Sequence, residues 1–146
     1  MSFSLVRCGA DGRPLTSISE VPEAIIATYA ANADLYRRVG FDPPWVSYVA
    51  VDGDRAVGGG AFVGKPRENR VEIAYFTVAE FEGRGYATRT AEELVAIAQK
   101  VIPGIVIIAF TLRESNASTR ILQRLGLKIY GDARDADAGD VWEWRM

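Results

Sequence analysis

The feature that most constrains the fold is the stretch of residues 71–100, in which an apolar run leads through a glycine loop into a helical pattern. Residues 71–78 are apolar or β-branched with the exception of Glu72, and such a run is typical of a strand buried on both faces. After Gly83 and Gly85, apolar residues recur at three- and four-residue steps, which predicts a helix with one apolar face. The sequence therefore predicts a strand, a glycine loop and a helix in direct succession.

This strand–loop–helix unit has the properties of an anion-binding site. Glycines let a ligand approach the backbone closely, and the first turn of a helix offers unpaired N–H groups at the positive end of its dipole. The two common nucleotide-binding motifs, a dinucleotide fingerprint after the first strand and G-x-x-x-x-G-K-[ST], are both missing from the sequence. We therefore expect a phosphorylated ligand at the loop, with a tight loop that binds nothing as the alternative.

The remaining sequence predicts the other elements of a single α/β domain that spans residues 1–146. Ser19 is the expected N-cap of the first helix, and residues 52–54 are a tight-turn signal that predicts a hairpin. Three glycines at 58–60 indicate either close packing or a substrate that lies against bare backbone. The expected strands cover residues 3–6, 45–51, 56–64, 71–78, 105–112, 127–130 and 141–145, and the expected helices cover 20–40, the stretch after the glycine loop, and a segment capped at 115–116 that ends at 125.

The chain contains no histidine, and this excludes several kinds of catalytic site. Ser-His-Asp and Cys-His machinery and histidine-ligated metal sites all need an imidazole, so proton transfer must use a carboxylate, tyrosine, lysine, cysteine or water. Cys8 is the only cysteine, and the net charge of −2 gives no basic field for nucleic acid. Since the sequence has no signal-like or membrane-length apolar segment, we expect a cytoplasmic protein with no membrane, nucleic-acid or metal partner.

Two segments resemble the GNAT superfamily of N-acetyltransferases. Residues 82–87 are similar to its Q/R-x-x-G-x-G/A motif, with Glu82 in place of the usual glutamine or arginine. The second segment, from Asn116 through Ser118 to Gly126, resembles the helix that flanks the cofactor, in particular in the branch that acetylates ribosomal proteins and N-terminal amines. The resemblance implies an α/β (α+β) fold with a mixed, mostly antiparallel sheet, splayed at its central strand and flanked by helices, with acetyl-CoA wedged in the opening.

The resemblance also implies which residues contact acetyl-CoA. Backbone groups of the central strand would meet the pantetheine arm, and the glycine loop would hold the pyrophosphate, where Glu82 would act through its backbone because its carboxylate repels phosphate. Residues 115 and 116 would touch pantetheine, with helix capping alone as the alternative. The implied contacts are Phe76, Thr77 and Val78 for pantetheine, Glu82, Gly83, Arg84, Gly85, Tyr86, Ala87 and Thr88 for pyrophosphate, and Ser115 and Asn116 at the helix.

Acetyl transfer to an amine requires a group that takes the amine proton, and Glu72 is the expected base. It is the one charge in an apolar strand, where burial would raise its pKa; the alternative is an ion pair with Arg70 or another cation. Ser118 matches a serine of the N-terminal-amine branch and would hydrogen-bond the leaving thiolate, with a capping role as the alternative. Leu122 occupies the position at which many relatives carry a tyrosine acid.

The sequence leaves the acceptor and the assembly open. A protein N-terminus, a small amine, an amino acid and an aminoglycoside are all compatible with it, and a homodimer is common in the family. Four aromatic residues, Tyr36, Trp45, Trp142 and Trp144, line an acceptor pocket or, as strand aromatics more often do, belong to the core. We expect direct attack in a ternary complex, since Cys8 lies far from the motifs. The rival functions are a non-catalytic acyl-CoA-binding or sensing domain and transfer of a longer acyl group.

Overall fold

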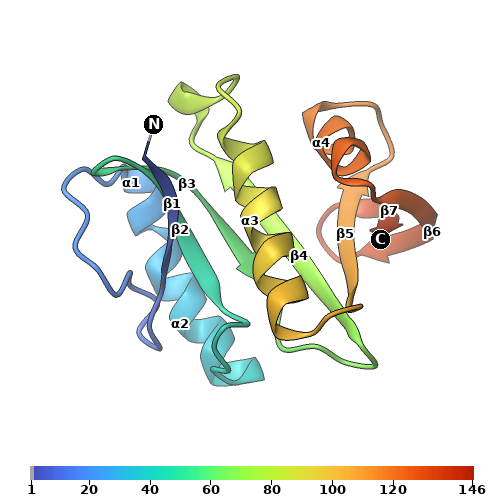
Figure 1. Ribbon diagram of the computed structural model, residues 1–146, viewed down its shortest axis with the longest axis horizontal. Coiled ribbons are helices and arrows are strands. Elements are labelled where there is room, and N and C mark those ends of the chain that lie inside the picture. Colours follow the sequence, from blue (N-terminus) through green and yellow to red (C-terminus); the bar gives the residue numbers. More distant parts are fainter. Residues whose placement is uncertain (1) are drawn as a thin grey trace.

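Seven strands form a mixed sheet in the computed structural model, which describes residues 2–146 (Figure 1). The strand order is β1-β2-β3-β4-β5-β7-β6, and neighbouring strands are antiparallel except for the parallel pair β4 and β5. The strands are β1 (Phe3–Arg7), β2 (Ser47–Asp52), β3 (Arg55–Phe62), β4 (Arg70–Thr77), β5 (Val106–Leu112), β6 (Lys128–Asp135) and β7 (Gly139–Arg145). The helices are α1 (Glu23–Ile26), α2 (Thr28–Val39), the short 3-10 helix η1 (Ala79–Phe81), α3 (Tyr86–Val101) and α4 (Ala117–Leu125).

The sheet opens between β4 and β5. These two strands pair only where Arg70, Val71 and Glu72 face Val106, Ile107 and Ile108. Beyond Glu72, β4 continues beside β3 as far as Thr77, whereas β5 continues beside β7 as far as Leu112. Figure 1 shows the two strands diverging from their shared lower end. The predicted splayed, mostly antiparallel sheet is therefore confirmed.

Helices cover the two faces of the sheet at β2 and β3. On one face, Ile25 of α1 packs against Val49 and Val51 of β2, and on the other face Ala50 and Val57 pack against Phe81 and Tyr86. These neighbours in sequence face opposite ways because side chains alternate along a strand. Helix α3 lies close over β3, since a Cβ built on Gly60 would come within 2.7 Å of Thr90 Cγ2. The glycine run thus permits close helix–sheet packing.

The largest core cluster lies around β4, β5 and β7 and includes Leu94, Ile107 and Leu122. Trp144 is also buried there at 1% exposure, and its indole Nε1 donates a hydrogen bond to Thr111 Oγ1 at 2.8 Å. The other three of the four aromatic residues, Tyr36, Trp45 and Trp142, belong to this cluster or pack against it. The alternative that placed these aromatic residues in the core is therefore confirmed.

Several expected boundaries were wrong. The helix expected at residues 20–40 is divided at Ala27, and its N-cap is Pro22 instead of Ser19. The polar segment expected to be a loop extends β6 to Asp135 and starts β7 at Gly139, because an edge hairpin can expose polar side chains while its backbone stays paired. Strand β4 is buried on one face only, since Phe76 is 39% exposed. No helix formed by residues 2–146 combines the length and apolar character needed to cross a membrane.

Candidate active site

A cavity of about 440 Å³ lies in the opening of the sheet, and we name it the loop cleft. Its wall combines the end of β4, the glycine loop with the first turn of α3, and the first turns of α4. The lining residues are 75–77, 81–83, 85–88, 117, 118, 120, 121 and 124. The structure therefore brings together the two motifs that lie some 30 residues apart in the sequence.

Most of the predicted cofactor contacts line this cleft, and some do not. Those in its wall are Phe76, Thr77, Glu82, Gly83, Gly85, Tyr86, Ala87 and Thr88, together with Ser118 from α4. Val78, Arg84, Ser115 and Asn116 lie outside the wall. Arg84 remains close to it, because its guanidinium lies 5.7 Å from the ring centroid of Phe81, which does line the cleft.

The loop geometry explains why glycines stand before α3. Gly83 and Gly85 have φ angles of +77° and +84°, in the left-handed region that residues with a Cβ rarely adopt. Considering residues 2–146 alone, no side chain caps the start of α3. The N–H groups of its first turn therefore remain available where Tyr86, Ala87 and Thr88 line the cleft. This arrangement can bind a phosphate group.

The backbone register of β4 decides which of its peptide groups point to the opening of the sheet. The Val78 N–H donates to the Val57 carbonyl, and the Glu72 carbonyl accepts from the Val63 N–H, both at 2.9 Å. In an antiparallel ladder every second residue directs its peptide groups to the partner, so those of Phe76 and Val78 point to β3. The peptide groups of Tyr75 and Thr77 point instead to the opening, where β5 no longer pairs with β4.

The start of α4 is held by a reciprocal capping box. The Asn116 side-chain oxygen accepts from the Thr119 N–H at 3.1 Å, and Thr119 Oγ1 accepts from the Asn116 N–H at 2.9 Å. Asn116 therefore has the capping role that was the alternative to a pantetheine contact.

Two residues outside the predicted contacts, Arg120 and Arg124, line the cleft one helical turn apart. Their i, i+4 spacing after the cap was the available signal, and their charge suits an anionic ligand.

A second cavity of about 190 Å³ lies between α1–α2 and strands β2–β4, and we name it the acceptor-side groove. It is lined by residues 8, 25, 28, 32, 47–49, 58–61 and 74–76, and none of these described residues is charged. Gly59 forms part of its floor, since a Cβ there would lie 2.8 Å from Cε1 of the Phe76 ring. The expected close packing thus describes this segment, and its bare backbone also lies beside a cavity.

Cys8 lines the acceptor-side groove, although it is distant from the motifs in sequence. Burial, and to a lesser extent the charge of Asp11, raises the pKa of the Cys8 thiol to about 11. A thiol with this pKa is almost entirely protonated at neutral pH, and the thiol form is a poor nucleophile. Cys8 is therefore unsuited to form an acyl-enzyme.

The two cavities share two lining residues, Tyr75 and Phe76. Side chains alternate along β4, so Tyr75 points to the same face as the buried Val71 and Ile73, and the Phe76 ring lies over Gly59 on the other face. Because β5 has already separated from β4 at this level, the loop cleft and the acceptor-side groove meet at this pair of residues.

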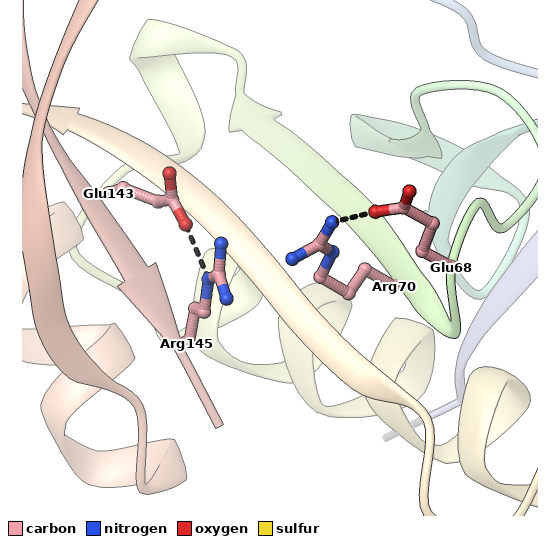
Figure 2. A network of polar contacts seen from close by, with 4 residues as sticks. All are labelled: Glu68, Arg70, Glu143 and Arg145. Atoms are coloured by element: carbon pink, nitrogen blue, oxygen red, sulfur yellow. Dashed lines mark hydrogen bonds and ion pairs between the residues drawn. The ribbon is translucent and has the colours of Figure 1, made fainter.

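Glu72 lies four residues before Phe76 and lines a third, shallow cavity of about 600 Å³. The two arginines nearest to it by register are engaged elsewhere: Arg70 pairs with Glu68 and Arg145 pairs with Glu143 (Figure 2). Within the described part of the chain, Glu72 itself forms no ion pair, so the alternative of a pair with Arg70 is not observed.

The environment of Glu72 makes its carboxylate more basic than usual. Burial raises the pKa of Glu72, and the negative charge of Asp135 raises it further. Because no ion pair with Glu72 among the described residues offsets these effects, the group gains affinity for a proton. Among residues 2–146, no group of three or more cysteine, aspartate or glutamate side chains is arranged to hold a metal ion.

The sheet opens at its central parallel pair, and the glycine loop and the start of α3 lie at this opening. The family model of the acetyltransferase (GNAT) domain matches residues 14–128. The chain therefore belongs to the GNAT acetyltransferase family, which makes it an acyltransferase by class.

Solved structures with the same fold include proteins that hold coenzyme A. An IAA acetyltransferase from Bacillus cereus ATCC 14579 is 18% identical, with 99% of both chains covered and a TM-score of 0.69. RimL, a ribosomal L7/L12 α-N-protein acetyltransferase in complex with coenzyme A, is 17% identical, with 85% of this chain and 71% of that chain covered and a TM-score of 0.66. The yncA protein of Salmonella typhimurium, with acetyl-CoA, is also 17% identical, with 82% and 72% covered and a TM-score of 0.61.

These likenesses establish the fold alone, because the identities are low. The chain spans 64% of the length of another structural match, a GNAT-family acetyltransferase from Bacillus anthracis. No curated protein matches the chain in sequence.

Proposed function

We propose that the protein is an acetyl-CoA-dependent N-acetyltransferase that joins acetyl-CoA and a primary amine in a ternary complex. The observation that carries this proposal is the meeting of the loop cleft and the acceptor-side groove at Tyr75 and Phe76. A thioester delivered through one cavity and an amine delivered through the other can react directly there. Cys8, with a thiol pKa of about 11, offers no competing covalent route.

The residues of the loop cleft fit acetyl-CoA along its length. The first-turn N–H groups of α3 would hold the pyrophosphate, with Glu82 contributing its backbone only, and Arg120 and Arg124 would face the phosphate groups. The outward peptide groups of Tyr75 and Thr77 would bind the amides of the pantetheine arm. The thioester would then lie where the two cavities meet.

Glu72 is the proposed base, acting through water. Its side chain shares a strand face with Ala74 and Phe76. The four residue steps from Glu72 to Phe76 span about 13 Å of strand, which exceeds the reach of a glutamate side chain. Most alkyl amines are protonated at neutral pH, so a relay to a carboxylate of raised pKa supplies the neutral nucleophile. Ser118, in the wall of the loop cleft, remains a proposed hydrogen-bond partner of the leaving thiolate.

The test is a two-substrate assay with acetyl-CoA and a panel of amines. The panel contains peptides with free N-termini, amino acids, small alkyl and aryl amines, and an aminoglycoside. We expect thiol release that requires both substrates, a product heavier by one acetyl group, and intersecting initial-rate plots. Acetyl-CoA binding without thiol release across the panel would contradict catalysis and favour a binding or sensing domain, and parallel plots would contradict the ternary complex.

A further inference from the structure

Tyr75 has a position that no other protic side chain of the two cavities shares. It lines both the loop cleft and the acceptor-side groove, and the only other described residue that does so is the apolar Phe76. If acetyl-CoA and an amine meet where the cavities meet, the carbon–sulfur bond that breaks lies beside these two residues. Of the pair, only Tyr75 carries a proton donor.

The Tyr75 hydroxyl is available to a ligand. The hydroxyl makes no hydrogen bond to any of residues 2–146. Every fully buried polar side-chain atom among these residues has a hydrogen-bond partner, so the unpaired Tyr75 hydroxyl must be accessible to solvent. Burial of the ring raises the pKa of Tyr75 to about 12, so the hydroxyl keeps its proton across the neutral range. Replacing tyrosine by phenylalanine at this position would therefore remove a donor without breaking a contact within the protein.

Other residues that could assist the leaving group are less well placed. Tyr86 also lines the loop cleft, but its hydroxyl donates to Asp52 Oδ2 at 2.5 Å. Leu122, at the position expected for an acid, is fully buried in the core. Ser118 lines the loop cleft but not the acceptor-side groove.

We propose that Tyr75 donates a hydrogen bond to the sulfur atom of coenzyme A as the thioester is cleaved; this rests on the proposed function. The amine nitrogen forms a bond to the acetyl carbon, the carbon–sulfur bond breaks, and its electron pair stays on sulfur. The amine proton passes through water to Glu72 and from there to solvent, and the thiolate is protonated by water after it leaves.

The proton stays on Tyr75 during this step. A thiol has an ordinary pKa near 8.5, so a thiolate is too weak a base to deprotonate a phenol of much higher pKa. Tyr75 therefore stabilises the negative charge on sulfur as a fixed donor, in a site where a charge-assisted hydrogen bond is stronger than a neutral one.

The test measures the pKa of the coenzyme A thiol in the bound state, for which no acceptor is needed. Coenzyme A labelled with ¹³C next to sulfur is bound to each protein, and its thiol is titrated by NMR. The proteins are the wild type, Tyr75→Phe, Ser118→Ala and the matched control Tyr130→Phe. Tyr130 is 64% exposed and lies outside both cavities. We expect the bound thiol of Tyr75→Phe to titrate about one pH unit or more above that of the wild type. Affinity for coenzyme A and melting temperature should match the wild type, and Tyr130→Phe should titrate as the wild type does.

The outcomes separate this inference from the proposed function. If the wild type binds coenzyme A and its bound thiol titrates at the same pH in Tyr75→Phe, the role of Tyr75 is overturned while the proposed function stands. A change in Ser118→Ala alone would assign the role to Ser118 and equally overturn the inference. If the wild type fails to bind coenzyme A, the proposed function fails at its first step and the inference fails with it.

Discussion

The loop cleft and the acceptor-side groove differ in how the chain builds them. The loop cleft depends on a short continuous segment, residues 81–88, completed by the end of β4 and the first turns of α4. The groove is assembled from residues of β1's end, α1, α2, β2, β3 and β4, which are scattered from position 8 to position 76. A glycine loop before a helix can therefore be recognised in the sequence, whereas the groove exists only after folding.

The chemistry of the two cavities also differs. The loop cleft is lined by backbone N–H groups at a helix start and by two arginines, and both kinds of group suit an anion. The groove offers uncharged side chains and bare glycine backbone within the described residues. Substitutions in one cavity should therefore change the binding of one substrate, and substitutions where the cavities meet should change the rate of transfer.

The largest effect is expected from Glu72→Gln, which changes neither cavity. This substitution preserves shape but removes the proton acceptor, so kcat should fall by roughly 10²–10⁴-fold with unchanged affinity for acetyl-CoA. The low-pH limb of the kcat profile, which reports the ionisation of Glu72, should disappear. Steady-state kinetics across pH and calorimetry measure both effects, with the exposed Glu93→Gln on α3 as the control. A wild-type kcat and profile would exclude Glu72 as the base.

Gly85→Glu should disable the loop cleft alone. Gly85 has a φ of +84°, so any side chain strains the loop, and a carboxylate would repel the phosphates. Affinity for acetyl-CoA should fall on the order of 100-fold or more in calorimetry. Gly104→Glu is the matched control, because Gly104 has the same φ of +84° and open space around it but follows the other end of α3. Equal losses in both variants would refute a local phosphate site.

Gly59→Ala should alter the acceptor-side groove. Its Cβ would lie 2.8 Å from the Phe76 ring and 3.2 Å from the Tyr48 carbonyl oxygen, so the ring must move into the groove. We expect KM for the amine to change about tenfold while the affinity for acetyl-CoA stays the same. Gly131→Ala, with nothing within 4 Å of the added carbon, serves as the control. If Gly59→Ala weakens acetyl-CoA binding instead, the two cavities are not independent.

The smallest effect concerns stability and pH. Burial raises the pKa of Glu72 in the folded state, so the protonated side chain stabilises the fold. This contribution to the free energy of unfolding is complete below the ordinary carboxyl pKa and is lost as pH rises through the raised pKa. Glutamine is neutral throughout, so Glu72→Gln should melt like the wild type in acid and slightly above it at neutral pH. Thermal melts at several pH values test this. A lower melting temperature for Glu72→Gln at neutral pH would mean that the carboxylate has a stabilising partner.

The strand–loop–helix unit could be predicted because it depends on local signals, whereas the splayed sheet was implied by the resemblance of two short segments to the GNAT family. The glycines of the loop, the apolar run of β4 and the capping residue Asn116 act within a few positions of themselves. The residues that present free peptide groups could not be predicted from β4 alone. Whether Tyr75 and Thr77 or Phe76 and Val78 face the opening is decided by the register with β3, and a shift of one residue would exchange the two sets.

The remaining errors have the same cause, which is dependence on distant parts of the chain. Cys8 is far from the motifs in sequence, yet it lies in the acceptor-side groove, since β1 pairs with β2 and the Cys8 N–H donates to the Ser47 carbonyl. The edge pairing of β6 with β7 turned an expected polar loop into strand. Arg120 and Arg124 carry a local spacing signal, but the cavity they face is completed by β4 and the loop.

The most direct test of the central claim is a crystal structure of the protein with coenzyme A. The account predicts the pyrophosphate on the first-turn N–H groups of α3, the pantetheine amides on the peptide groups of Tyr75 and Thr77, and the sulfur beside Tyr75 and Phe76, open to the acceptor-side groove. A coenzyme A molecule whose sulfur lies away from this pair of residues, or that leaves the opening between β4 and β5 empty, would contradict the account.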